Sequence, residues 1–330
     1  EQIKRRLDST MDKEFTIVTA FFDIKRHSYA GKNSGRNYDY IKYFEFWARI
    51  QNKMVIYCEP EYEQMIKDIR ASHGLQDRTT VIAVEDKYQL YPKTYERMRQ
   101  IEANPKFERF RYQSQWLSNN AGYNYVVMLK YWCLNDAVER GLVEDTAAWV
   151  DFGYDHDGEF YLSQEEFAFT MHGDVEEDKI YLYALKDIND VHVGEALQIQ
   201  YDVVAGAIMV VPKQLAQTFL ELAQNAVQAL FMLDCMDNDQ QLALMAVRQR
   251  PELFHVNQGD FWWMDMKLYW GGEHLTTIPR TEQKNNFLAL RKLARFLRSR
   301  RKTKDEHIES YLKELDKTIR HYWNNGRVEW

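Results

Sequence analysis

The chain has 330 residues, of which 45% are hydrophobic and 28% are charged. This composition excludes a disordered chain and is sufficient for one large domain or about two of average size. Lys and Arg number 43 against 50 Asp and Glu, so the formal net charge of −7 argues against a surface built for nucleic-acid binding.

The cysteines and the apolar segments indicate a cellular compartment. Cys58, Cys133 and Cys235 are odd in number and lack metal-ligand spacing, so we expect reduced and mostly buried thiols. The longest uncharged apolar run, residues 203–211, is much shorter than the ~20 residues of a membrane-spanning helix. The start of the sequence also lacks the apolar core of a signal peptide. We therefore expect a cytoplasmic protein, soluble or peripheral on a membrane.

The N-terminal third alternates between strand and helix patterns. Strands are predicted at residues 15–22, 53–57 and 79–84, where β-branched and aromatic residues concentrate. Helices are predicted between them, at residues 38–50 and 62–72. Strands that alternate with helices predict a parallel sheet with right-handed crossovers.

The middle of the chain continues this pattern. A helical region at residues 91–140 precedes a strand at 146–150, and two more strands are predicted at 179–183 and 203–211. Pro212 suits the first position of the next helix, and a further helix begins near Asp237. An aromatic cluster at residues 261–264 and 269–272 is predicted either to stack on an acceptor sugar or to close the core.

The composition changes near the C-terminus. Eight Lys and Arg residues occur between residues 287 and 304 without an acidic residue, beside an apolar stripe. We therefore predict a main domain at residues 1–280 and an extension of basic amphipathic helices at 281–330. Residues 287–304 suit contact with an anionic membrane, and a second apolar stripe at residues 308–323 suits a homo-oligomer contact. No nucleic-acid partner is expected, because the rest of the chain is acidic.

Asp151 ends a buried strand. The run Thr146-Ala147-Ala148-Trp149-Val150 is apolar and is followed at once by this acid and by a turn. Ligands of open α/β sheets bind in the crevice beyond the carboxyl ends of the strands. We therefore expect Asp151 to face a ligand, with a helix cap or a structural hydrogen bond as the alternative.

Four segments, residues 16–23, 44–57, 149–154 and 205–211, resemble the bacterial HtrL/YibB family, which is associated with surface-polysaccharide genes. The resemblance covers roughly residues 15–270. The order of parts also resembles that of GT-A glycosyltransferases, in which an Asp-x-Asp strand tip is followed by a small-residue strand and an acidic helix start. The resemblance implies an α/β, GT-A-like (Rossmann-like) fold with a mostly parallel central sheet flanked by helices.

The same resemblance implies an activity. A sugar would pass from a nucleotide sugar, specifically a UDP-sugar, to a growing lipopolysaccharide or capsular polysaccharide, a glycan or lipid-linked glycan, at the inner face of the cytoplasmic membrane. Such transfer usually needs a divalent cation, held by carboxylates, on the departing diphosphate. Asp151 is the candidate carboxylate for Mn²⁺, with His274 as a further ligand. Gly153 stands where the second acid of Asp-x-Asp would be, so the metal is uncertain from the sequence.

A second acid is needed if the reaction inverts, because the acceptor hydroxyl must lose its proton as it attacks. Asp237 and Asp239 compete for this role. Asp237 also has N-cap spacing with Gln240, three residues further on. Asp239 resembles the acid of the Asp-Gln step in GT-A enzymes, and its alternative role is a favourable position in the helix dipole.

Other residues are expected beside the nucleotide sugar by analogy with GT-A proteins. The base and ribose would bind at the end of the first strand, at Thr19, Phe21, Asp23 and Arg26. Arg26 or Lys130 would pair with the diphosphate, near Asp151 and Gly153. Gly206 would let a sugar approach the backbone, or it serves only sheet packing.

Two other functions stay open from the sequence. The missing acid at Gly153 also suits a non-catalytic nucleotide-sugar or glycan-binding assembly protein with the same fold. A metal-dependent hydrolase using Asp151, Asp155 and Asp157 is the third possibility, although an Asp-His-Asp-Gly sequence favours a turn whatever the function.

Overall fold

The computed structural model describes residues 13–25, 39–110, 119–199 and 202–279. The chain divides into two compact units, Glu1–Thr277 and Ile278–Trp330, and the first unit contains the strands and helices described below. The basic helices expected at residues 281–330, with the membrane segment at 287–304 and the second stripe at 308–323, lie outside the described residues.

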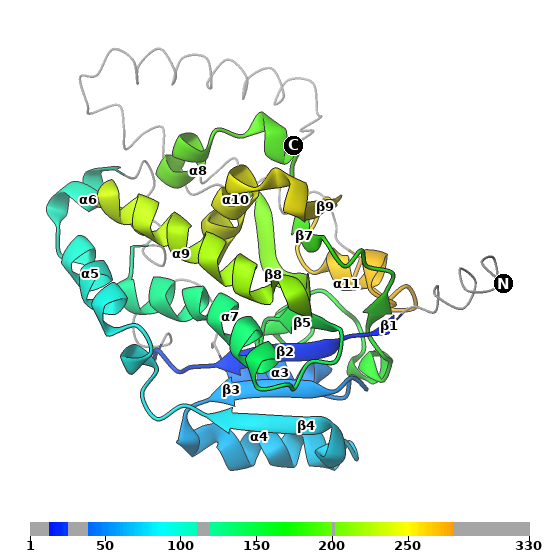
Figure 1. Cartoon of the computed structure of the whole chain (residues 1–330). Coiled ribbons are helices and arrows are strands. Elements are labelled where there is room, and N and C mark those ends of the chain that lie inside the picture. Colours follow the sequence, from blue (N-terminus) through cyan, green and yellow to red (C-terminus); the bar gives the residue numbers. More distant parts are fainter. Residues whose placement is uncertain (1–12, 26–38, 111–118, 200–201, 280–330) are drawn as a thin grey trace. The chain divides into compact units, whose positions relative to one another are not determined.

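A central sheet organises the first unit (Figure 1). Among the described residues it has seven strands in the order β4-β3-β2-β5-β8-β7-β9. Their bounds are β2 Thr16–Phe21, β3 Met54–Cys58, β4 Thr79–Ala83, β5 Thr146–Val150, β7 Ile180–Ala184, β8 Val204–Pro212 and β9 Phe254–Gln258. Every pairing in this sheet is parallel except those of β8, which runs antiparallel to both β5 and β7. The predicted α/β class with a mostly parallel central sheet is confirmed.

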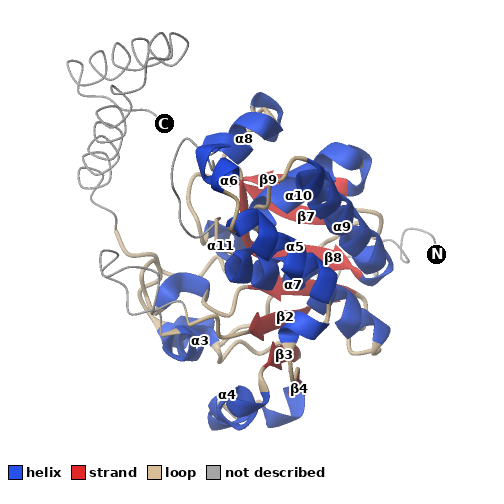
Figure 2. Ribbon diagram, turned by 90° about the vertical axis from the view of Figure 1, so that its left-hand side faces the viewer, coloured by secondary structure: helices blue, strands red, loops and turns tan. Residues whose placement is uncertain are grey.

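Helices cover both faces of the sheet (Figure 2). Their bounds are α3 Tyr40–Trp47, α4 Pro60–Ser72, α5 Pro92–Glu102, α6 Pro105–Phe110, α7 Ala121–Glu139, α8 Val193–Ile199, α9 Ala216–Met232, α10 Asp239–Gln249 and α11 Met264–Tyr269. Helices α5, α7, α9 and α10 share one hydrophobic cluster with the sheet, and α3, α4 and α11 share another. A short pair, β1 (Lys13–Glu14) and β6 (His172–Gly173), forms a second sheet. No helix in the described ranges has the length and apolar character needed to cross a bilayer.

Strand β5 shows how the apolar pattern sets the position of Asp151. Ala147 and Trp149 point into the cluster under α7, whereas Ala148 and Val150 point into the cluster on the other face. Side chains two residues apart share a face of a strand, so Asp151 follows Trp149 towards α7. Cys58, Cys133 and Cys235, all within the described ranges, are buried and free, as predicted.

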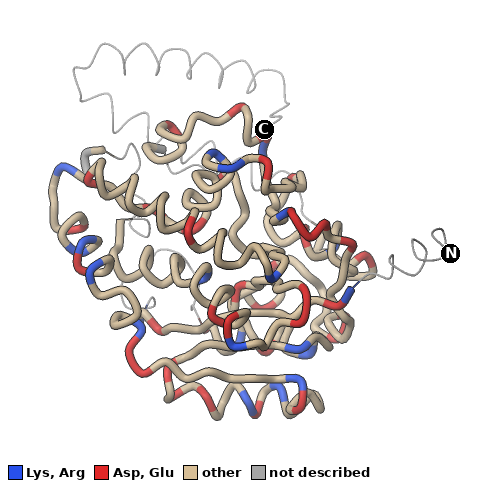
Figure 3. Tube along the Cα trace, in the orientation of Figure 1, with Lys and Arg blue, Asp and Glu red and all other residues tan. Residues whose placement is uncertain are grey.

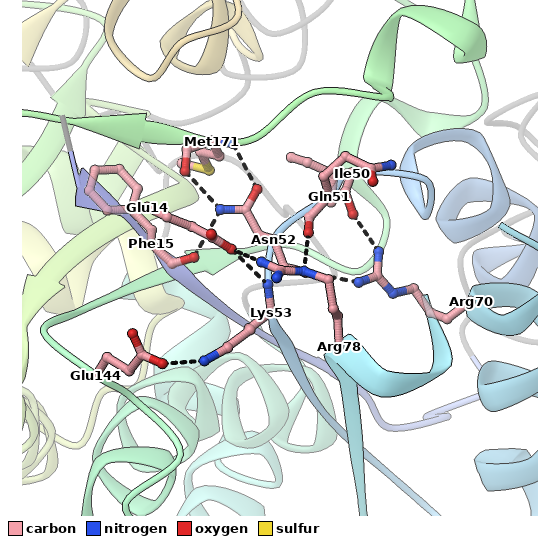
Figure 4. Close-up of polar contacts among 10 residues, drawn as sticks. All are labelled: Glu14, Phe15, Ile50, Gln51, Asn52, Lys53, Arg70, Arg78, Glu144 and Met171. Carbon is pink, nitrogen blue, oxygen red and sulfur yellow. Dashed lines mark hydrogen bonds and ion pairs between the residues drawn. The ribbon is translucent and has the colours of Figure 1, made fainter. Parts of the chain in front are cut away.

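A buried polar network ties together the amino ends of β2, β3 and β4 (Figure 4). The Arg70 guanidinium donates to the carbonyls of Ala48 (2.7 Å), Ile50 (2.5 Å) and Asn52 (2.9 Å), and its Nε donates to Thr79 Oγ1. Burial lowers the pKa of Arg70 to about 10, so the group remains charged at neutral pH. The turn before β3 is therefore fixed by one side chain of α4.

Replacing Arg70 by Met is expected to destabilise the fold by about 3 kcal/mol or more, because three buried carbonyls lose their donors. Arg78→Met is the matched control, since Arg78 is part-exposed and donates to one backbone carbonyl, that of Gln51. Urea denaturation of both variants measures the difference. Equal midpoints for the two would contradict the role given to Arg70.

Candidate active site

A cavity of about 530 Å³ opens at the carboxyl ends of β2 and β5. Its lining comes from the end of β2, helices α3 and α7, the tip of β5, strand β8 and the first turn of α10. The volume falls within the range of about 300–1,000 Å³ that is typical of small-molecule sites. Open α/β sheets bind ligands at this position, beyond the carboxyl ends of the strands. Asp151, which we expected to face a ligand, lines the cavity.

The floor of the cavity is an ion cluster centred on Lys130. Its Nζ lies 2.6 Å from Asp151 Oδ1, 2.7 Å from Asp239 Oδ2 and 2.9 Å from the carbonyl oxygen of Gly206. Lys130 donates hydrogen bonds to Asp239 and to the Gly206 carbonyl, and it forms an ion pair with Asp151. The Trp149 indole also donates to Asp151 Oδ1, at 2.7 Å. Lys130 therefore joins α7, β5, β8 and α10 at one atom.

The surroundings of Lys130 explain why it stays charged. The only charged residues of α7 are Lys130, Asp136 and Glu139, and Figure 3 shows the helix as almost uniformly uncharged. Lys130 is 6% exposed and Asp239 is 4% exposed. Burial opposes the charged form of Lys130, but the carboxylates of Asp151 and Asp239 outweigh it and raise its pKa. Burial raises the pKa of Asp239, and Lys130 opposes that rise.

Asp239 reaches the cluster because it is the first residue of α10. The N-cap of this helix is Asn238, whose side chain accepts hydrogen bonds from the backbone N–H groups of Gln240 and Gln241. The sequence-based alternative that Asp237 is the cap is therefore wrong. Asp237 accepts from the Asn238 N–H at 2.8 Å and is not among the lining residues of the cavity. Of the two candidate bases, the structure brings Asp239 to the site.

Gly206 and Gly153 line the cavity at positions where a larger side chain would collide with a neighbouring one. A Cβ at Gly206 would lie 2.0 Å from Asp239 Oδ2, so the space over Gly206 is filled by that carboxylate. A Cβ at Gly153 would lie 2.9 Å from Tyr40 Cε1, so the Tyr40 ring occupies the place of a side chain there. Gly206 thus makes room for an acid of this chain, which differs from the expectation that it admits a sugar.

The residues present do not fit the expected Mn²⁺ site. Asp151 Oδ1 is engaged by Lys130 and Trp149, and Gly153 leaves no room for a second acid. His274 does not line the cavity, and its Nε2 lies 2.8 Å from the carbonyl oxygen of Glu166. Within the described ranges, no group of three or more His, Cys, Asp and Glu side chains is placed to hold a metal ion.

Four residues were expected to bind the base and ribose of the nucleotide, and the structure places two of them at the cavity. Phe21 and Asp23 line the cavity, whereas Thr19 is buried within β2 and does not. Phe21 packs against Tyr62 and Phe152, with ring centroids 4.7 and 5.0 Å away. Asp23 accepts from the backbone N–H of Lys25 at 2.6 Å and from Tyr62 Oη at 3.2 Å. Arg26 lies outside the described residues.

An aromatic wall lines the cavity and was largely missed from the sequence. Its members are Phe21, Tyr40, Tyr62, Tyr123, Phe152, His156, Trp262 and Trp263. Trp263 has a left-handed backbone, with φ of 70°, and its carbonyl accepts from the hydroxyls of Tyr154 and Tyr161. Its ring lies 5.1 Å from that of His156. Two sequence signals pointed to this wall, Phe21 at the end of the first strand and the cluster at residues 261–264.

Two buried acids, Asp265 and Asp155, lie close to members of the aromatic wall in the sequence and form hydrogen bonds there. Asp265 Oδ1 lies 3.1 Å from Tyr154 Oη and accepts from the Met266 N–H at 2.9 Å. Asp155 Oδ1 accepts from the backbone N–H groups of Phe160 and Tyr161. Burial raises the pKa of each acid to about 7. Asp157 pairs with Lys42 at 2.5 Å, and neither Asp155 nor Asp157 lines the cavity, so the hydrolase constellation does not assemble.

Stability is expected to fall as pH rises from about 4 to about 7, because the folded state keeps protons on Asp265 and Asp155 that an unfolded Asp, with a pKa of 3.8, releases. Asp265→Asn should remove a slope of up to about 1.4 kcal/mol per pH unit across this interval. Urea denaturation at a series of pH values measures it. Asp178→Asn, at a largely exposed acid, is the control, and an unchanged slope in Asp265→Asn would contradict the assignment.

The order of parts that the GT-A resemblance implied is present. The tip of β5 carries Asp151, the small-residue strand β8 carries Gly206, and α10 begins on Asp239. The chain is also similar to a solved structure, mouse xyloside xylosyltransferase 1 in its apo form. The two are 14% identical with a TM-score of 0.39, and the match covers 78% of this chain and 93% of that one.

Sequence comparison gives the family. The chain is 28% identical over 279 residues to Protein HtrL of Escherichia coli (strain K12), covering 78% of this chain and 92% of that relative. Residues 13–270 match the model of a family described as "Bacterial protein of unknown function (HtrL_YibB)". Because that match spans well over half of the chain, the protein belongs to the HtrL/YibB family.

Proposed function

We propose that this protein is a glycosyltransferase that moves a sugar from a nucleotide sugar to a glycan acceptor. The observation that carries the proposal is the meeting of Asp151 and Asp239 on one ammonium group, at the floor of a cavity beyond the carboxyl ends of parallel strands. Transfer at an anomeric carbon passes through a positively charged, oxocarbenium-like state. Preorganised carboxylates stabilise such a charge.

The two acids have different surroundings, which supports different roles. Asp239 is almost fully buried, and burial raises its pKa, which makes it a stronger base for an acceptor hydroxyl than an ordinary Asp carboxylate. The Asp151 side chain is 28% exposed and is oriented by Trp149 and Lys130, which suits a group that faces the donor sugar. Lys130 contacts Oδ1 of Asp151 and Oδ2 of Asp239. The second carboxylate oxygen of each acid is therefore outside this pairing with Lys130.

The donor and acceptor are a finer part of the proposal. A UDP-sugar is proposed as the donor, with its base beside Phe21 and Tyr62, two of the aromatic side chains that line the cavity. The acceptor is proposed to be a lipopolysaccharide or capsular glycan at the inner face of the cytoplasmic membrane. The basic composition of residues 287–304 supports contact with anionic lipid there, at about 1 kcal/mol for each cation near the surface.

A nucleotide screen tests the proposal. Thermal shift and calorimetry with UDP, GDP, CMP, dTDP and their sugars would compare wild type with Asp151→Ala, and with Asp157→Ala as a variant outside the cavity. A ligand at ~100 times its dissociation constant stabilises by about 2.7 kcal/mol, which is a measurable melting shift. Selective binding of one nucleotide sugar, weakened only in Asp151→Ala, is the expected result. Binding of none of these ligands would contradict the proposal.

A second candidate is a non-catalytic nucleotide-sugar or glycan-binding protein. The observation that favours it is Gly153, which stands where the second acid of the strand tip would be and whose missing Cβ would lie 2.9 Å from Tyr40 Cε1. The two candidates differ in turnover. Release of nucleotide from a bound donor in the presence of glycan acceptors supports the transferase, whereas tight binding without release supports the binding protein.

A further inference from the structure

We infer that Lys130 is a built-in cation that occupies the position of a divalent metal ion between Asp151 and Asp239, so that this pair of carboxylates binds no metal. The inference deepens the proposed function, and it rests on that function only for the consequence that transfer proceeds in the presence of a chelator. The cation position itself is a property of three segments of the chain and is measurable without any donor or acceptor.

The first step is the chemistry around Lys130 Nζ. Its three neighbours are two carboxylate oxygens and a backbone carbonyl oxygen, at 2.6, 2.7 and 2.9 Å. These are the ligand types that hard divalent cations take in proteins. They come from β5, α10 and β8, which no local turn brings together. The three oxygen atoms form a site suited to a cation, and the ammonium group of Lys130 occupies it.

The second step is burial. Lys130 and Asp239 are 6% and 4% exposed and the Asp151 side chain is 28% exposed, so solvent only partly weakens the repulsion between the two carboxylates. Removing one member of a buried ion cluster leaves the other charges uncompensated, which is strongly unfavourable. The two acids therefore need a cation at all times, and the side chain that supplies it is anchored on a 19-residue helix.

The third step concerns the alternative place for a metal. The residue two positions after Asp151 is Gly153, and the Tyr40 ring lies against it. Asp151 Oδ1 already pairs with the Lys130 ammonium and accepts a hydrogen bond from Trp149. A divalent ion at Asp151 would have to displace Lys130 or bind through a single remaining oxygen, which is a poor site for an ion that takes six or more oxygen ligands.

Direct Mn²⁺ binding tests the inference. Electron paramagnetic resonance of free Mn²⁺ and calorimetry would be applied to the wild-type protein, Asp151→Asn, Lys130→Ala and the double variant. We expect wild type and Asp151→Asn to bind Mn²⁺ equally, without a site that depends on Asp151. Lys130→Ala should gain one bound Mn²⁺ per chain, and the double variant should lose it again.

The matched control is Lys87→Ala. Lys87 is also buried and pairs with a carboxylate, that of Glu59, but its other neighbour is a carbonyl oxygen and no second acid reaches it. It should gain no Mn²⁺ site. If Lys130→Ala does not fold, the wild-type comparison with Asp151→Asn still decides: a Mn²⁺ site in wild type that disappears in Asp151→Asn overturns the inference. Absence of a new site in a folded Lys130→Ala also overturns it.

These outcomes are separate from those of the proposed function. Nucleotide-sugar binding by wild type in excess chelator, at the same affinity as without it, is expected if both proposals hold. Binding of no nucleotide sugar would remove the proposed transferase and leave the Mn²⁺ result standing. A Mn²⁺ site at Asp151 in wild type would remove the inference and leave the transferase standing with a metal.

Discussion

Asp239→Asn is expected to slow sugar transfer by about 10²–10⁴-fold, which is the usual contribution of a positioned general base. The amide cannot take a proton from the acceptor hydroxyl, although it has nearly the shape of the carboxylate. Lys130 keeps its contacts with Asp151 and the Gly206 carbonyl, and Tyr131 still donates to the backbone of residue 239. Initial rates of nucleotide release, together with the melting temperature, measure the effect.

The control for this prediction is Asp237→Asn, two residues earlier at the same helix start. Asp237 is equally buried, but it hydrogen-bonds the Asn238 N–H and is absent from the cavity lining. Its replacement should leave the rate within a few fold of wild type. Asn238 caps α10 in both variants, so helix loss would not explain a difference. Equal activity of Asp239→Asn and wild type would exclude Asp239 as the base.

The sheet and the Asp151 tip were predictable because they depend on local patterns. The strand predicted at residues 203–211 is β8, Val204–Pro212, and the one at 146–150 is β5. Both are continuous apolar runs, which strands buried on both faces require. Asp151 follows such a run directly, so its place at the carboxyl edge came from chain order alone. Trp149, two residues earlier, is buried in the hydrophobic cluster under α7, so Asp151 lies on that same face of the sheet.

The ion cluster was not predictable in the same way. Lys130 and Asp239 are 109 positions apart, and no spacing in the sequence connects them. The sequence offered Lys130 as a partner for diphosphate, whereas the structure shows its ammonium group in contact with Asp151, Asp239 and the Gly206 carbonyl of the chain itself. Asp237, Asn238 and Asp239 are all good N-cap residues, so a pattern could not decide which one caps α10. That one-residue difference decides which acid enters the cavity.

The aromatic wall was hidden for a related reason. Tyr40, Tyr62 and Trp263 come from α3, α4 and the residue before α11, and they meet only when both the sheet and its loops are formed. Aromatic residues make up 14% of the chain, so their presence at any one position carries little information. The left-handed backbone of Trp263 was also invisible, because no glycine marks it.

Gly206→Ala is expected to lower the rate of transfer by about 10²-fold or more, since a displacement of about 1 Å at a reacting group costs that much. The new Cβ would lie 2.0 Å from Asp239 Oδ2, so the carboxylate must leave its contact with Lys130. Overpacking of this kind also destabilises by about 1–3 kcal/mol. Nucleotide-release rates and urea denaturation measure the two effects.

The comparison that isolates this steric effect is Gly122→Ala in α7. A Cβ there would lie 3.3 Å from the Asn120 side chain and 3.5 Å from Tyr88 Oη, distances that small side-chain shifts accommodate. Removing a glycine from a helix stabilises it by up to about 1 kcal/mol, and the close contact with Asn120 Oδ1, which caps α7, opposes that gain, so Gly122→Ala should stay within about 1 kcal/mol of wild type. If Gly206→Ala keeps both rate and stability, the Asp239 carboxylate does not need the place that Gly206 leaves for it.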